Sequence, residues 1–64
     1  MKRVRGILIL DEVNYKSRLF KFGDMEVWVP RSVTGSMMKY QPDKNGHREC
    51  VFEVEEWFAE KNNL

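Results

Sequence analysis

The chain has 64 residues, of which 42% are hydrophobic and 33% are charged, with a formal net charge of +1. These totals leave room for one small core, and they exclude a disordered chain and, with a single cysteine, an internal disulfide. The apolar run of residues 7–10 is too short for a secretory signal or a membrane helix, so we expect a protein of a reducing, cytoplasmic compartment.

Strands are expected to dominate the first half of the chain. Residues 3–13 are rich in aliphatic side chains and predict a first strand, followed by strands at residues 18–22 and 25–29. Turn residues at 14–17 and the Gly23-Asp24 pair separate these strands. Pro30 has no backbone N–H, so pairing should end there or lie at a sheet edge.

Residues 31–47 are expected to form a long loop. Gly35, Pro42 and the Asn45-Gly46 pair interrupt any regular pattern in this segment. One helical turn at residues 36–40 would carry the apolar side chains of the loop. Loops of this length in compact domains are often functional.

A strand and a helix complete the expected order. One face of the strand at residues 48–54 is apolar: Cys50, Phe52 and Val54. The last segment, VEEWFAEKNNL, predicts a helix of two to three turns with Val54, Trp57, Phe58 and Leu64 on one face and Asn62 or Asn63 as its cap. The order ββββα predicts one α+β domain, residues 1–64, with a small antiparallel four-stranded sheet or open barrel and one C-terminal helix.

Several strands carry large apolar side chains on both faces. The first has Leu8 and Leu10 on one face and Ile9 on the other, and the third has Val27 opposite Trp28. One short helix covers only one face, and each large apolar side chain left in water forgoes about 1.5–3 kcal/mol. The second face is therefore covered in one of three ways: the sheet closes into a barrel with the loop folded over it, a second copy binds in a homodimer, or a partner molecule binds.

No set of residues predicts catalysis. In an extended segment, the odd spacing between His47 and Cys50 makes them face opposite ways, and Cys50 is in phase with the apolar face. We find no metal ligands at recognised spacings and no phosphate-binding glycine loop. We therefore expect a protein that is not an enzyme and that uses no metal or cofactor.

The first hypothesis for function is a protein-binding module. Methionine and tyrosine are favoured at adaptable interfaces, and the loop at residues 31–47 contains both. The expected partner contacts are Trp28, Pro30, Arg31, Met37, Met38 and Tyr40. In the alternative interpretation, the methionines and Tyr40 simply close the open end of the sheet.

The second hypothesis is binding of single-stranded nucleic acid. Bases outnumber acids through residue 22, whereas acids outnumber bases from residue 48, which gives the molecule two electrostatic ends. Aromatic side chains on a twisted sheet can stack on bases while cations neutralise phosphates. The contacts under this hypothesis are Lys16, Arg18, Phe20, Lys21 and Phe22.

Two segments, EVWVPRSV and FEVEEWFAEKNNL, resemble short proteins of bacteriophages and prophages. In those proteins a strand of the type Trp-Ile-Pro-Lys-Ser precedes a terminal helix of the type Val-Pro-Glu-Trp-Leu-Ala-Glu-Lys. The resemblance extends over roughly residues 16–33 and 52–64 and rests on Trp28, Pro30, Ser32, Trp57, Ala59, Glu60 and Lys61. Glu55 stands where proline is common, and the central loop is longer than in those proteins.

The resemblance implies a phage or mobile-element origin and a site of action in the cytoplasm of a bacterial host cell. We therefore expect a small non-enzymatic protein that modulates or inhibits bacterial host machinery, of the host-takeover or anti-defence type, through protein–protein contacts. The ββββα order is also similar to small single-strand-binding folds of the transcription-cofactor type, which dimerise. The expected partners are a bacterial host protein and a second copy of the chain, with nucleic acid as the alternative and no membrane.

Overall fold

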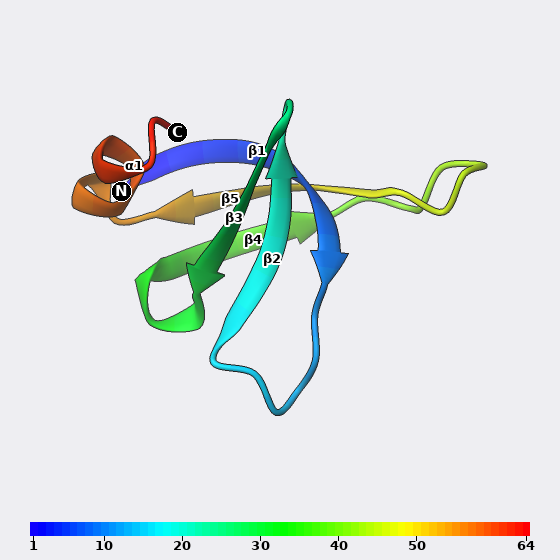
Figure 1. Ribbon diagram of the computed structural model, residues 1–64, viewed down its shortest axis with the longest axis horizontal. Coiled ribbons are helices and arrows are strands. Elements are labelled where there is room, and N and C mark those ends of the chain that lie inside the picture. The colour runs from blue at the N-terminus through cyan, green and yellow to red at the C-terminus, as the bar shows by residue number, and fades with distance from the viewer.

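The computed structural model describes residues 1–64 and shows one antiparallel sheet followed by one short helix (Figure 1). The five strands lie in the order β3-β2-β1-β5-β4. The elements are β1 Lys2–Leu10, β2 Ser17–Phe22, β3 Met25–Pro30, the 3₁₀ turn η1 Arg31–Val33, β4 Thr34–Lys39, β5 Arg48–Val54 and α1 Glu56–Lys61. The predicted α+β class, with an antiparallel sheet and a C-terminal helix, is confirmed, but the sheet has five strands instead of four.

The additional strand, β4, lies where a long loop was expected. It pairs with β5, with Met37 opposite Phe52 and Met38 opposite Val51. The prediction of a loop over residues 31–47 with a helical turn at 36–40 is therefore wrong, and only residues 40–47 connect β4 to β5. The ladder formed with β5 outweighs the weak local preference of this segment for a strand, at the expense of an irregularity in the register after Thr34.

The connection between β4 and β5 is held by Asp43. Its Oδ1 accepts hydrogen bonds from the backbone N–H of Asn45 at 2.8 Å and of His47 at 3.0 Å. These backbone hydrogen bonds hold the pKa of Asp43 below its usual value. Gly46 adopts a φ of +81°, a left-handed conformation that glycine tolerates best. The turn residues at Asn45-Gly46 therefore do mark a turn.

β1 contains a bulge that moves its last residues to the other face. Leu8 pairs with Phe20, but after the bulge it is Leu10 that pairs with Leu19. Directly opposed residues share a face and neighbouring residues on a strand do not, so Leu10 lies on the face opposite to Leu8. The expectation that Leu8 and Leu10 share a face is wrong because the bulge inserts one residue. The strand also ends at Leu10 instead of continuing to residue 13.

The core lies on one face of the sheet, which we call the inner face. Phe20 of β2 and Phe52 of β5 stack there with ring centroids 4.4 Å apart. The sheet bends so that β2 and β3 run across β4 and β5 (Figure 1), and β3 and β4 both remain edges, so the sheet is open and not a closed barrel. The buried core residues are Val4, Phe20, Val27, Val29, Val33, Cys50, Phe52, Val54, Phe58 and Ala59. This confirms the predicted apolar face of residues 48–54.

Helix α1 contributes Phe58 and Ala59 to the core. Trp57, in contrast, is 55% exposed, so its expected place on the buried face of the helix is wrong. The helical spacing had been counted from Val54, which belongs to β5 and not to the helix. Asn62 is the C-cap, as one of the two predicted cap residues, and Asn63 follows it with a φ of 58°. No helix is long and apolar enough to cross a membrane.

Candidate binding surfaces

The outer face of β1, β5 and β4 combines apolar and charged side chains. Strand pairing places Arg5, Val51 and Met38 side by side in one row across the three strands. The next row along the strands holds Arg3 beside Glu53. Since the core occupies the inner face, these side chains point away from it.

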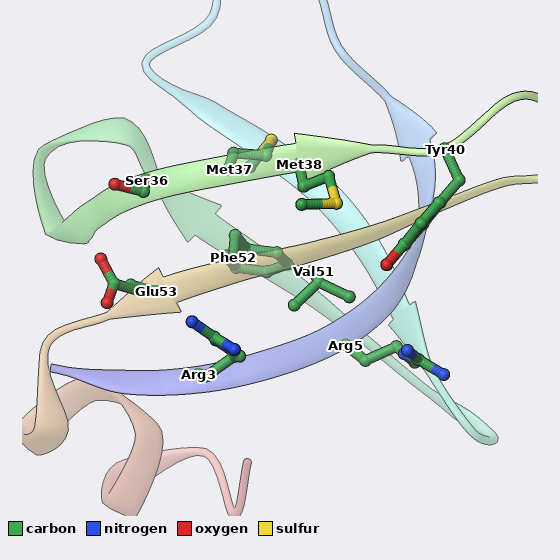
Figure 2. A pocket seen from close by; sticks show the side chains of 9 residues that line it. All are labelled: Arg3, Arg5, Ser36, Met37, Met38, Tyr40, Val51, Phe52 and Glu53. Atoms are coloured by element: carbon green, nitrogen blue, oxygen red, sulfur yellow. The ribbon is translucent and has the colours of Figure 1, made fainter.

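These side chains line a hollow of about 450 Å³, which we call the outer hollow (Figure 2). Figure 2 shows Met38, Tyr40 and Val51 on the open side of the strands, with the arginines along β1. Met38 is 59% exposed and Tyr40 is 42% exposed. The residues that line the outer hollow are Arg3, Arg5, Ser36, Met37, Met38, Tyr40, Val51, Phe52 and Glu53.

The arginines of the outer hollow have few partners within the protein. Arg5 Nη1 lies 3.9 Å from Glu49 Oε1, at the outer limit of an ion pair. Arg3 forms no ion pair with any residue of the chain. Exposed pairs of this kind contribute little to stability. Both guanidinium groups can therefore bind an acceptor on another molecule, beside an apolar area that can receive its side chains.

The residues expected to contact a partner do not form one surface. Met38 and Tyr40 lie in the outer hollow. Met37 borders it as well, but its side chain packs against the core because it shares the inner face with Phe52. Trp28 lies on β3 at the other edge of the sheet, where it is 47% exposed.

Arg31 is held inside the protein by the β1–β2 connection. Its Nε donates to the carbonyl oxygen of Tyr15 at 2.9 Å, and its Nη2 donates to the carbonyl oxygen of Glu12 at 2.9 Å and to Asp11 Oδ1 at 2.7 Å. Pro30, which ends β3, is half-buried. Arg31 thus fixes the path of residues 11–16, a role that the sequence pattern did not indicate.

Asp11 gathers three cations, and we call these four residues the Asp11 cluster. Oδ1 accepts a hydrogen bond from Arg31 at 2.7 Å, while Oδ2 accepts one from Lys39 Nζ at 3.2 Å and lies 3.4 Å from Arg18 Nε. Burial raises the pKa of Asp11, but the hydrogen bonds from Arg31 and Lys39 and the nearby charges outweigh burial and hold it below the usual value. Three cations and one carboxylate leave the cluster with an excess of two positive charges.

The aromatic platform expected for nucleic acid is not available on β2. Phe20 is fully buried, and Phe22 packs against the core. Both prediction and position agree that Phe20 and Phe22 share a face, but that face is the core. Among the cations of the same hypothesis, Arg18 belongs to the Asp11 cluster, whereas Lys16 and Lys21 are exposed.

A different aromatic pair is open to solvent near this end of the sheet. The ring centroids of Tyr15 and Trp28 lie 6.0 Å apart, and both side chains are about half exposed. Trp28 is opposite Leu19 in the β2–β3 ladder, on the outer face. The tryptophan therefore shares its surface with a residue of the β1–β2 connection, outside the strands that the sequence pattern defines.

Titratable groups with nucleophilic or basic character lie apart from one another. Cys50 is fully buried, and burial raises the pKa of its thiol. His47 lies in the β4–β5 connection, with Nδ1 3.9 Å from Asp43 Oδ2. No group of three or more His, Cys, Asp or Glu residues is placed to hold a metal ion.

The residues that sequence reasoning missed fall into two sets. Arg3, Arg5 and Val51 occupy the positions that alternate with core residues on β1 and β5, so the alternation that gave the core also contained them. Lys39 and Asp11 meet only because β4 exists and folds toward the end of β1. No sequence signal connects residues so far apart.

Comparison of the chain with protein-family models, with curated proteins and with solved structures finds no match of any of these kinds.

Proposed function

We propose that this chain is a small, non-enzymatic binding protein that acts through protein–protein contacts made by the outer hollow. The observation that carries the proposal is the position of Met38 and Tyr40, which are largely exposed beside Val51 on a face that no other element covers. Exposed apolar groups of this kind are typical of interaction sites. Tyrosine, methionine and arginine, the residue types of the hollow, are enriched at the centres of protein interfaces.

We take the partner to be a protein of a bacterial host and the effect to be inhibition or modulation of that protein. This part of the proposal rests on the resemblance of residues 26–33 and 52–64 to bacteriophage and prophage proteins. Trp28 and Trp57, the two tryptophans that carry the resemblance, are both about half exposed. Large aromatic side chains on the surface support a role in contacts more than a role in folding. The site of action would then be the cytoplasm of the bacterial cell.

A second copy of the chain is the other occupant that we propose for the outer hollow. A two-fold dimer needs a self-complementary surface. The outer face supplies one, because Arg3 and Arg5 of one copy can face Glu49 and Glu53 of another. Sedimentation of the purified protein at micromolar concentration tests this first, and a Met38→Ser/Tyr40→Ser double variant should be monomeric where the wild type dimerises.

The binding of a host protein is tested by capture from bacterial lysate, followed by purification of the captured protein and measurement of its Kd. We expect the Met38→Ser/Tyr40→Ser variant to bind at least about tenfold more weakly, equivalent to about 1.4 kcal/mol. Val13→Ser is the matched control, since Val13 is an exposed apolar residue outside the outer hollow. Equal binding by the wild type and the double variant would refute the outer hollow as the contact site.

A further inference from the structure

The Asp11 cluster and the Tyr15–Trp28 pair are neighbours at one end of the sheet. A single residue, Arg31, connects them, because its Nη2 bonds to Asp11 and its Nε bonds to the carbonyl oxygen of Tyr15. The ring of Tyr15 in turn lies 6.0 Å from the ring of Trp28. A cluster with excess positive charge is thereby placed beside two half-exposed aromatic rings.

The Asp11 cluster has more hydrogen-bond donors than its one carboxylate accepts. Arg18 Nε is buried and has no hydrogen-bond partner, although the Arg18 side chain as a whole is 19% exposed. Lys39 makes one hydrogen bond to Asp11, and the Nη1 group of Arg31 makes none. A buried donor without a partner is uncommon and unfavourable. An anion that reaches the cluster would find donors from three side chains already gathered.

We propose that this region is a binding site for single-stranded nucleic acid. A phosphodiester group accepts hydrogen bonds from Lys39, Arg18 and the Nη1 group of Arg31, and an unpaired base stacks on Trp28 or Tyr15. The proposal concerns a different surface and a different ligand from the outer hollow. It also replaces Phe20 and Phe22, the aromatic contacts expected from the sequence, with the two rings that are open to solvent.

Two features favour a nucleic acid over an acidic protein segment as the ligand. Carboxylates of a protein would use the cations but would have no particular use for the exposed aromatic pair, whereas phosphate neutralisation together with base stacking is the usual basis of single-strand binding. The local excess of positive charge is also not cancelled by the adjoining loop, because Glu12 and Lys16 contribute one charge of each sign. A duplex offers phosphates but no unstacked base, so single strands should bind more tightly.

The first test uses a Trp57→Phe variant, in which Trp28 is the only tryptophan. We expect labelled single-stranded oligonucleotides of about 12 nucleotides to bind with micromolar Kd at low salt and to quench Trp28 fluorescence. The logarithm of the association constant should fall linearly with the logarithm of the salt concentration, by about 0.7 for each phosphate neutralised. Absence of binding at low salt, or equal affinity for duplex and single strand, would overturn the proposal.

Variants of single residues then locate the site. Lys39→Gln should weaken binding several-fold and reduce the salt slope by about 0.7, whereas Lys39→Arg should retain binding. Lys44→Gln is the matched control, since Lys44 is an exposed lysine of the β4–β5 connection that makes no contact with the cluster. Trp28→Leu should weaken binding by about fivefold or more through loss of stacking. Each variant is first shown to be folded by its thermal transition.

Three results would contradict this assignment. Lys44→Gln might weaken binding as much as Lys39→Gln does, which would mean that only overall charge matters. A polyglutamate peptide of equal charge might displace the oligonucleotide at the same concentration, which would show a general anion site. Finally, the Met38→Ser/Tyr40→Ser variant should bind oligonucleotide like the wild type, so that failure of either surface can be told apart from failure of the other.

Discussion

The two faces of β5 show how one strand serves both folding and binding. On the inner face, Cys50, Phe52 and Val54 are at most 1% exposed. On the outer face, Val51 lies between two glutamates and remains half-buried. The difference arises because the β2–β3 hairpin and α1 fold over the inner face, while the outer face meets only the neighbouring strands. Stability should therefore depend on one face, and binding on the other.

The largest expected difference is between Phe52→Ala and Val51→Ala, neighbouring residues on opposite faces. Phe52 stacks on Phe20 at 4.4 Å in the middle of the core, so its truncation should lower the free energy of unfolding by about 3–5 kcal/mol. Val51→Ala should lower it by less than about 1 kcal/mol. Urea denaturation of both variants measures the difference. Similar losses would show that the outer face is buried in solution, as in a stable homodimer.

Two glycines extend the comparison to the space around the backbone. A Cβ on Gly6 would lie 2.7 Å from the ring of Phe22, whereas one on Gly35 would lie 2.8 Å from Met1 Sδ, the flexible end of the first residue. Gly6→Ala should therefore destabilise the protein by about 1–3 kcal/mol, and Gly35→Ala by clearly less, because Met1 can move. Thermal denaturation of the pair compares them. A larger loss for Gly35→Ala would contradict a mobile first residue at that position.

Acid should weaken the Asp11 cluster before it affects the core. The folded pKa of Asp11 lies below its ordinary value of 3.8, so the stability that the carboxylate contributes is complete above that value and is lost as the pH falls through the folded pKa. Asp11→Asn should lower stability near pH 7 by about 1–2 kcal/mol, between an exposed and a buried ion pair. It should also flatten the decline of stability between pH 5 and the acid limit. Denaturation curves at several pH values measure both effects, and an unchanged acid limb would contradict the assignment.

The smallest expected change in stability comes from the Met38→Ser/Tyr40→Ser variant. Both side chains are largely exposed on the edge strand, so their loss should change the free energy of unfolding of the monomer by less than about 1 kcal/mol. The same variant is expected to lose the proposed protein contact. A cooperative urea transition close to that of the wild type, together with lost binding, separates the two roles. A large loss of stability would instead assign these residues to the structure of the strand.

The core of this fold was more predictable than its surfaces. The alternation of Cys50, Phe52 and Val54 identified their common face because each residue on a strand reverses the side of the one before it. Leu10 was misplaced since a bulge depends on the partner strand and leaves no mark in the sequence of β1. Of the residues expected at a protein contact, Met38 and Tyr40 reached the outer hollow, whereas Arg31 turned out to be held by the loop beside it.

By itself, the sequence determined the elements whose pattern is local: the first three strands with their turn residues, the inner face of β5, and a short helix ended by asparagine. Tertiary structure alone decided the rest. β4 forms because β5 offers a ladder to a segment with little strand preference of its own, and the bend of the sheet decides that Phe20 is buried while Trp28 is open. The Asp11 cluster joins residues from β2, β4 and two connections, so it exists only once long-range pairing has brought them within hydrogen-bond distance.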